Sequence, residues 1–464
     1  MNTRYDMPQN YYFGGGTDTF LTPLAAVILL VAIVLIVGLP RKWMIVPVVV
    51  AGLLLPFDLG ILVMGFHFSA LRLLVAAGWL RFAVRRDIGV TRVNSLDKAV
   101  LAWAFCKAIF FSILWATTSA VTNRLGFLST TLATYFLVRF LIRDKEDAVG
   151  AVRVLAVTMI ILAPFMMIEH FTQHNFFSVL GSPPISSIRD GAVRATGPFG
   201  HPVVAGTVGA MLLPLFTGLW WQGKRYRTIL GLGVLSSIGV TFASSSSTPL
   251  MTCAGGVLAL LLWPLRTRLR TIRWALVLSL ITLHLVMNAS VWFLIARMGG
   301  AIGGSGYHRA MLVDNFVRHF SEWWLIGTRN NADWGYDMWD VDNAFVGAGV
   351  GGGLITFATF IAVLVYAYKR VGKSRRLASK SRKDERFVWA VGASLFANTV
   401  GFFGIVYFDQ SIVAWYCVLA MVSATATFLV DSKKTPTESR NGRDQAETKT
   451  EDASLIPQYS ARWA

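Results

Sequence analysis

The sequence predicts an all-α polytopic membrane protein that crosses the bilayer about 12 to 13 times. Thirteen apolar stretches run through its 464 residues, and a helix needs about 20 such residues to cross the hydrocarbon core. Charged residues make up only 15% of the chain, against about 25% in a typical soluble domain. Basic residues gather in every second gap between the stretches, which is the distribution expected of cytoplasmic loops.

The apolar stretches set the predicted spans and their orientation. They are residues 22–39, 43–57, 59–80, 98–116, 125–142, 150–168, 203–221, 228–243, 248–264, 274–295, 343–368, 387–405 and 411–430. With the basic gaps inside, residues 1–21 form an extracytoplasmic N-terminal segment and residues 22–430 form one transmembrane domain. Residues 431–464 mix charges of both signs with polar residues, so we expect a disordered cytoplasmic tail.

The net charge of +18 does not indicate a nucleic-acid-binding protein, because the basic residues are dispersed between spans rather than gathered in one patch. We interpret the charge as a topology signal and as an attraction to anionic lipid headgroups. The cysteines, Cys106, Cys253 and Cys417, all fall inside predicted spans, so we expect no disulfide framework. The first 20 residues are polar and show no cleavable signal peptide.

Two long outer loops, 169–202 and 296–342, hold most of the polar chemistry, and the first ends in a segment rich in glycine and proline, Arg189 to Pro202. Irregular backbone at the membrane surface is tolerated where it is buried in protein or lines a wet cavity. Arg194 and His201 are therefore expected at the mouth of the next helix, where a guanidinium suits a phosphate or pyrophosphate. The alternatives are an ion pair between Arg194 and Asp190, and a helix-capping role for His201.

The second outer loop carries a short amphipathic helix that begins near Tyr307. Apolar side chains recur there at helical spacing, at Leu312, Phe316, Phe320 and Trp323, so we expect the helix to lie along the outer membrane interface. Arg309 falls in its first turn beside His308 and is expected to point toward a cavity. The alternative is a surface arginine that holds lipid headgroups. Arg318, near the end of the helix, is also predicted to bind substrate.

Aspartates among aromatic residues close this loop, at Asp333, Asp337, Asp340 and Asp342. Carboxylates accept hydrogen bonds from sugar hydroxyls and aromatic faces stack on sugar rings, so the segment is typical of a sugar-binding edge. Asp342 adjoins the membrane, where desolvation raises the pKa of a carboxyl toward that of a useful base. The alternative is an N-cap of the next span at Asp342 or Asn343. The spacing does not fit an EF-hand loop, and we expect no metal.

Charged residues inside the predicted spans are few. Lys107 lies near the centre of its span, where charge is costly and faces a cavity or a partner, so we predict a substrate-binding or ion-paired role. Arg72 falls past the midpoint of its predicted span, toward the cytoplasm, and Arg139 falls near a cytoplasmic end. We interpret both as residues that snorkel to the interface.

These features resemble the O-antigen ligase and polymerase superfamily, bacterial membrane proteins that join lipid-linked glycans. The likeness extends from the early spans to about residue 430. It depends on the layout and on two motifs: Arg194 to Pro202 leading into a span, and the loop that opens with the Arg309 helix and ends at Asp342-Asn343 before a glycine-rich span. The family's ligases place a histidine where this chain has Asp342, so the residue that activates the acceptor would be a carboxylate.

The resemblance implies metal-independent, inverting glycosyl transfer on the periplasmic face of the bacterial inner membrane, with no cofactor. The donor would be a glycan on undecaprenyl pyrophosphate, and the acceptor a second glycan, a lipid A core or a protein, in lipopolysaccharide or exopolysaccharide synthesis. Arg194 and Arg309 would bind the diphosphate and Asp342 would act as the base. His201, His308, Tyr307, Asn343, Arg318 and Lys107 complete the predicted substrate-binding set.

Two other functions compete with this prediction. A transporter or flippase of lipid-linked glycans would distribute polar residues through several spans and would open to both sides, whereas here the polar residues gather in two outer loops. A non-catalytic membrane scaffold would not need paired arginines and an aspartate-aromatic loop. Ligase and polymerase remain equally open.

Overall fold

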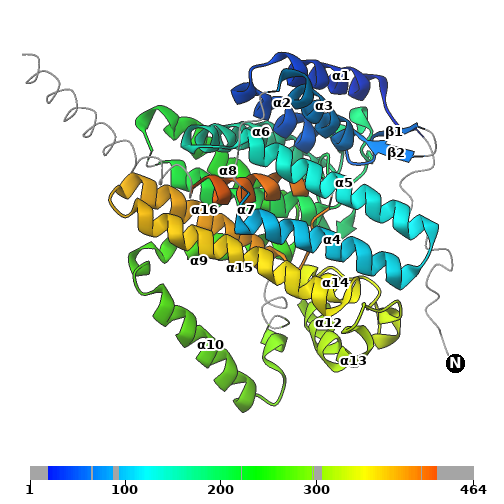
Figure 1. Cartoon of the computed structure of the whole chain (residues 1–464), viewed down its shortest axis with the longest axis vertical. Helices are drawn as coiled ribbons and strands as arrows, with labels where there is room; N and C mark the ends of the chain where they lie inside the picture. Colours follow the sequence, from blue (N-terminus) through cyan, green and yellow to red (C-terminus); the bar gives the residue numbers. More distant parts are fainter. Residues whose placement is uncertain are drawn as a thin grey trace, which may run out of the picture.

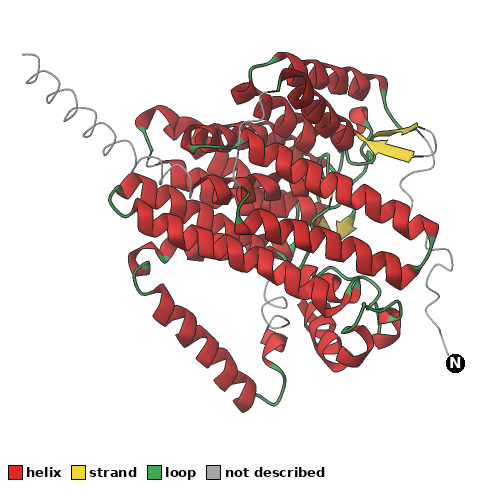
Figure 2. Cartoon of the chain, in the orientation of Figure 1, coloured by secondary structure: helices red, strands yellow, loops and turns green. Residues whose placement is uncertain are grey.

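Helices make up nearly all of the regular structure (Figure 2) in the computed structural model, which describes residues 19–63, 66–86, 93–220, 222–294, 296, 306–408 and 410–425. The longer helices are α1 (Pro23–Gly38), α2 (Arg41–Leu54), α3 (Ala70–Arg85), α4 (Ser95–Trp115), α5 (Thr118–Leu141), α6 (Lys145–Thr172), α7 (Pro202–Trp220), α8 (Arg227–Ala243), α9 (Ser247–Leu261), α10 (Leu269–Val286), α12 (Gly306–Arg318), α14 (Ala344–Val350), α15 (Gly353–Ala378) and α16 (Arg382–Gly401), followed by Ser411–Thr425. This confirms the predicted all-α class.

Shorter elements connect these helices. They are the one-turn helix α13 (Phe320–Trp323), the 3₁₀ turns η1 (Phe176–Leu180), η2 (Lys224–Tyr226), η3 (Trp263–Leu265), η4 (Val291–Phe293) and η5 (Asn331–Trp334), and two antiparallel hairpins, β1 (Gly60–Val63) with β2 (Phe66–Ser69) and β3 (Ile188–Arg189) with β4 (Ala192–Val193). The predicted tail, 431–464, and most of the predicted N-terminal segment, 1–21, lie outside the described residues.

Five helices of the described chain, α4, α6, α7, α10 and α15, are long and apolar enough to cross a membrane. Four shorter apolar helices, α1, α8, α9 and Ser411–Thr425, accompany them. The structure therefore supports a helical membrane protein, while the number of 12 to 13 spans and their orientation remain predictions.

Helix α7 forms the centre of the bundle and packs against α6, α8, α9 and α16. Almost all of its residues are buried, which agrees with its lack of charged residues. Gly218 lets α16 approach closely, because a Cβ added there would lie 2.0 Å from the Cβ of Ala390; small residues serve this purpose in membrane helix packing. By contrast, α10 has no buried residue and stands apart from the other helices (Figure 1).

The predicted span 59–80 is wrong in its first half. Gly60–Val63 and Phe66–Ser69 form the antiparallel pair β1–β2, with Gly60 paired to Ser69, and α3 begins only at Ala70. Summed hydropathy does not distinguish an apolar strand from a helix, which explains the error. Arg72 therefore lies in the first turn of α3, where its guanidinium donates hydrogen bonds to the carbonyl of His67 and to Thr130. The sequence predicted a position past the midpoint of a span, but Arg72 lies at the start of its helix.

Arg139 was expected to snorkel, but it is almost fully buried instead. Its Nε lies 3.5 Å from a carboxylate oxygen of Asp97 at the start of α4, and the hydroxyl of Tyr135 donates to the same oxygen at 2.6 Å. A buried guanidinium needs such a partner. This polar network ties α4 to α5 at the end of the bundle away from the two long loops.

The predicted span 343–368 is divided into two helices. A bend at Gly351 and Gly352 separates α14 from α15, and Gly353 has a φ of +71°, which side chains rarely adopt. Helix α15 then continues to Ala378, well past the predicted end. Its last turns carry the basic residues that the sequence places in a cytoplasmic loop.

The segment from α12 to η5 packs on protein. Phe316 and Trp323 stack with ring centres 3.9 Å apart, and together with Leu312 they pack against Val346 and Val350 of α14. The predicted amphipathic helix is present, but its apolar face covers α14, and Phe320 of the predicted stripe is exposed. These contacts hold the second loop beside the start of α14, at the lower right of Figure 1.

Candidate functional site

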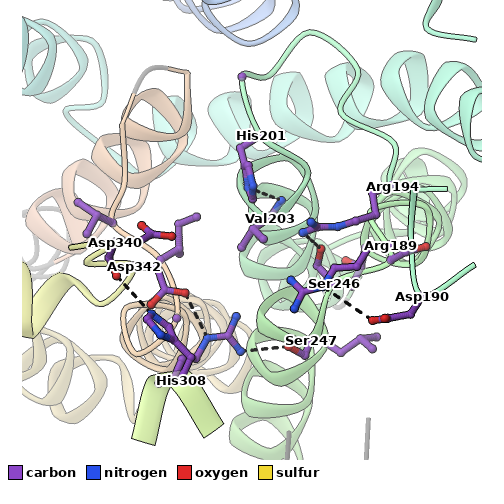
Figure 3. Close-up of a pocket in the computed structure, with 18 of the residues that line it drawn as sticks. Arg189, Asp190, Arg194, His201, Val203, Ser246, Ser247, His308, Asp340 and Asp342 are labelled. Atoms are coloured by element: carbon purple, nitrogen blue, oxygen red, sulfur yellow. Dashed lines mark hydrogen bonds and ion pairs between the residues drawn. The ribbon is translucent and has the colours of Figure 1, made fainter. Parts of the chain in front are cut away.

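A cavity of about 870 Å³ opens where the two long loops meet the starts of α7 and α9. Its lining includes five of the residues singled out from the sequence: Arg194, His201, His308, Arg309 and Asp342. Figure 3 shows two facing walls, with Arg189, Arg194 and Ser246 on one side and His308, Asp340 and Asp342 on the other. The walls differ in charge, one cationic and one acidic.

Glu169, near the end of α6, organises the backbone that carries Arg194. Its side chain is 1% exposed, and it accepts hydrogen bonds from the Ser186 hydroxyl (2.6 Å), the backbone N–H of Thr196 (2.7 Å) and the backbone N–H of Gly197 (2.9 Å). These donors belong to a loop with no helix or long strand to satisfy them. The carboxylate therefore holds both ends of the segment around Arg194 against α6.

Between these ends, the β3–β4 hairpin turns at Asp190 and Gly191, which both have positive φ, +52° and +76°. An Asp-Gly pair is the ordinary solution for a two-residue turn of this kind. The hairpin directs Arg189 and Arg194 toward the cavity (Figure 3). The ion pair expected as an alternative between Arg194 and Asp190 is not the one formed. Asp190 pairs with Arg189 instead, at 3.8 Å.

The start of α9 receives both predicted arginines. Arg194 donates to the Ser246 hydroxyl at 2.8 Å and Arg309 donates to the Ser247 hydroxyl at 3.0 Å. Ser246 is the N-cap of α9, so the positive end of the helix dipole lies beside two guanidinium groups. An anion at this place would meet the helix terminus and both arginines together.

Arg309 is 4% exposed, so the alternative of a surface arginine bound to lipid headgroups is wrong. It fits because residue 404 is glycine: a Cβ there would lie 2.9 Å from Nε of Arg309. The same Nε lies 3.6 Å from a carboxylate oxygen of Asp342. Desolvation lowers the pKa of Arg309 and the Asp342 charge opposes that change, but an arginine remains protonated at neutral pH in either case.

Asp342 belongs to the acidic wall and pairs with Arg309. Burial raises the pKa of its carboxyl, and Arg309 opposes that increase. Its Oδ1 is buried and makes no hydrogen bond within the described chain, whereas the side chain as a whole is 24% exposed and lines the cavity. Nε2 of His308 lies 3.3 Å from the carbonyl oxygen of Asp340, on the same wall.

His201 both caps a helix and faces the cavity. Its Nδ1 accepts the backbone N–H of Val203 at 3.3 Å, which confirms the capping role and leaves Nε2 to carry the proton. Desolvation, followed by the charge of Arg194, lowers the pKa of His201 to about 4. The ring is therefore neutral at pH 7 and presents an N–H donor.

This lowered pKa predicts a pH effect on stability. Below pH 6.5 the unfolded chain protonates His201, whereas the folded chain does so only near pH 4, so acid favours unfolding between these values. We expect the Tm of the wild type to fall more between pH 7 and pH 5 than the Tm of His201→Gln. The glutamine keeps an acceptor for the N–H of Val203 but does not titrate. Equal shifts in the two proteins would contradict the assignment.

Four predicted site residues lie outside the cavity lining. Tyr307 is 66% exposed, and the exposed side chain of Arg318 pairs with the buried carboxylate of Asp314 at 2.6 Å. Asn343 is buried as the N-cap of α14, where it accepts the N–H groups of two following residues. The N-cap alternative therefore holds for Asn343 and not for Asp342.

Lys107 is the fourth of these residues, and it lies on α4. Its Nζ is 4.8 Å from the ring centre of Phe127 and 5.5 Å from that of Trp103. Within the described chain no carboxylate forms an ion pair with it. Aromatic faces, which attract cations, replace the expected ionic partner.

Sequence reasoning missed several residues that build the site. The two serines at the start of α9 gave no signal beyond a polar gap between spans. Glu169 was placed just past a predicted span, although a lone carboxylate at the end of an apolar helix is itself a signal of a buried partner. Arg189 was noted only as the start of a motif, yet it lines the cavity.

Fold and cavity together define a helical membrane protein with an arginine-lined polar cavity at one end of its bundle. No known protein family and no curated protein matches the chain. In the described part of the chain, no three His, Cys, Asp or Glu side chains are grouped so that they could hold a metal ion.

Proposed function

We propose that this protein transfers a glycan from undecaprenyl pyrophosphate to an acceptor hydroxyl at the cavity, as O-antigen ligases and polysaccharide polymerases do. The acceptor would be a glycan, a lipid A core or a protein, and the cavity would open to the periplasm from the bacterial inner membrane. One observation carries the proposal: Arg194 and Arg309, from two separate loops, both reach the first residues of α9. A diphosphate bound there would be neutralised by two fixed cations and a helix terminus.

The chemistry follows from the two walls. The acceptor hydroxyl oxygen attacks the anomeric carbon of the donor sugar, and the bond from that carbon to the diphosphate oxygen breaks with its electron pair on the diphosphate. Arg194 and Arg309 stabilise this developing charge. The proton of the hydroxyl passes to Asp342, and attack from the face opposite the diphosphate inverts the anomeric configuration. Neutral His201 donates an N–H from the side of α7.

Reconstitution tests the proposal against its alternative, transport of a lipid-linked glycan. The purified protein would be placed in liposomes with a labelled undecaprenyl-pyrophosphate oligosaccharide and an acceptor glycan. Formation of a new glycosidic bond, with release of undecaprenyl pyrophosphate, is expected. Translocation of the labelled lipid without a new bond would instead identify a flippase. If a folded protein, tested with several acceptors, neither formed a bond nor translocated the lipid, both functions would be contradicted.

Asp342→Asn is expected to lower kcat about 100- to 10,000-fold, which is the usual contribution of a general base. The wild-type rate should fall as the pH drops toward the pKa of Asp342, which burial raises above its ordinary value, and Asp342→Asn should lose this acid limb. Asp333→Asn is the matched control, because Asp333 belongs to the same loop but does not line the cavity. Full activity in Asp342→Asn would rule out the base.

A further inference from the structure

The segment Tyr336 to Asp340 lies at the rim of the cavity and combines carboxylates that line it with exposed aromatic rings. Met338 is 3% exposed and anchors the segment in the cluster around Trp334, and its carbonyl accepts a hydrogen bond from Asn331. Tyr336 and Trp339 are 76% and 55% exposed. Large aromatic side chains held at a polar rim in this way are typical of recognition surfaces. Because Met338 is buried, it holds in place the backbone that carries the two exposed rings.

The carboxylates of this segment line the cavity, and each exposed ring is next in the chain to one of them. Asp337 and Asp340 both line the cavity (Asp340 is labelled in Figure 3). Neither forms an ion pair within the described residues, although His308 is close enough to Asp340 to oppose the rise in its pKa that burial and Asp337 cause. Arg309, a cation that also lines the cavity, pairs with Asp342. This wall is therefore rich in acceptors and negative.

A surface with acceptor oxygens beside aromatic faces fits one chemical class of ligand. Sugars present hydroxyl donors at the edge of a ring and apolar C–H groups on its face, so carboxylates bind the edge while aromatic rings cover the face. A sugar with a carboxylate of its own would bring another negative charge to a wall whose arginine, Arg309, already pairs with Asp342. Repulsion between like charges about 4 Å apart in a solvated site lowers the affinity several-fold to tenfold.

We propose that Tyr336, Asp337, Trp339 and Asp340 form a subsite for the acceptor glycan, selective for neutral or amino sugars over sugars that carry a carboxylate. The inference rests on the proposed function, since that function makes the acceptor a glycan, and it adds the charge class of the sugar. It also separates the cavity into a cationic half for the diphosphate and an acidic half for the acceptor.

A direct binding experiment tests the subsite without any transfer reaction. The probes are tetragalacturonic acid and its methyl ester, which share one backbone and differ in charge. Binding to the full chain in lipid nanodiscs would be followed by tryptophan fluorescence and by saturation-transfer NMR at pH 7. We expect the ester to bind at millimolar concentration and the acid to bind about tenfold more weakly. No binding of the ester, or equal binding of the two probes, would overturn the proposal.

Variants test the aromatic rings and the carboxylates separately. Replacing both Tyr336 and Trp339 with alanine is expected to weaken binding of the ester at least tenfold, since the stacking of sugar rings on both aromatic side chains is lost. Asp337→Asn with Asp340→Asn should bring the affinity for the acid up to that for the ester. Trp324→Ala, at an exposed tryptophan outside the cavity lining, is the control and should bind like the wild type.

The outcomes also separate this subsite from the proposed function. All the substituted side chains are exposed or face the cavity, and equal thermal unfolding of variants and wild type would confirm that they fold. Unchanged ester binding in the double alanine variant would overturn the subsite even if reconstituted protein transfers glycan. Conversely, selective binding without any glycan transfer would support the subsite and contradict the proposed enzymatic function.

Discussion

Arg309→Ala is expected to lower kcat for glycan transfer by about 100- to 1,000-fold, the usual effect of removing one donor that stabilises charge in the transition state. The substitution removes the guanidinium at the start of α9 and the cation beside Asp342. Arg194→Ala should have a similar effect, because its guanidinium reaches the adjacent serine. The measurement is the initial rate of transfer from a lipid-linked oligosaccharide at saturating donor.

Two further variants guard the interpretation of this result. Arg309→Lys keeps the charge but loses the planar fork, so we expect partial activity and a stable fold. Arg318→Ala removes a positive charge from the same helix, α12, but from its exposed side, where Arg318 pairs with Asp314. It should transfer at the wild-type rate. Full activity in a folded Arg309→Ala protein would remove the diphosphate role.

Glu169→Ala is expected to destabilise the protein by about 3 kcal/mol, because each buried donor that loses its acceptor costs about 1–3 kcal/mol. The donors that lose this acceptor are the hydroxyls of Ser186 and Thr196 and the backbone N–H groups of Thr196 and Gly197. Glu169→Gln keeps one acceptor oxygen but places an amide donor opposite another donor, so its loss should be smaller. Thermal unfolding in detergent measures both.

The control for this prediction lies on the same helix. Glu146, in the first turn of α6, forms an exposed pair with Lys42 at 3.2 Å, and such pairs contribute at most about 1 kcal/mol. Glu146→Ala should therefore unfold almost like the wild type. If Glu169→Ala also did so, the carboxylate would not hold the first loop. Because that loop carries Arg194, loss of glycan transfer should accompany the loss of stability.

Several apolar stretches could be located closely from hydropathy alone. The predicted 22–39, 203–221 and 228–243 differ by one or two residues from α1, α7 and α8. Long apolar runs exclude water so strongly that their helical state hardly depends on their neighbours. The pairing of strands β1 and β2 and the bend before Gly353 were not predictable, since strand pairing and a positive φ depend on the residues that lie beside them.

For the candidate site, residue chemistry identified the participants better than their contacts. Arg194, His201, His308, Arg309 and Asp342 were chosen from two loops and line one cavity. Tyr307, Arg318 and Lys107 were chosen by the same reasoning and do not. An arginine has the same sequence signature whether it faces a cavity, as Arg309 does, or solvent, as Arg318 does. The two environments are distinguished only by which face of α12 packs on α14, and that is decided by the tertiary structure.

The sequence by itself determined that this chain is helical and apolar, and that its polar chemistry gathers in two loops between spans. Those properties follow from composition and order along the chain, which act locally. The tertiary structure decided that Glu169 holds the first loop, that α9 begins between the two arginines, and that one wall of the cavity is acidic. Such relations join residues far apart in the chain, and their energies exist only when packing brings those residues within hydrogen-bonding distance.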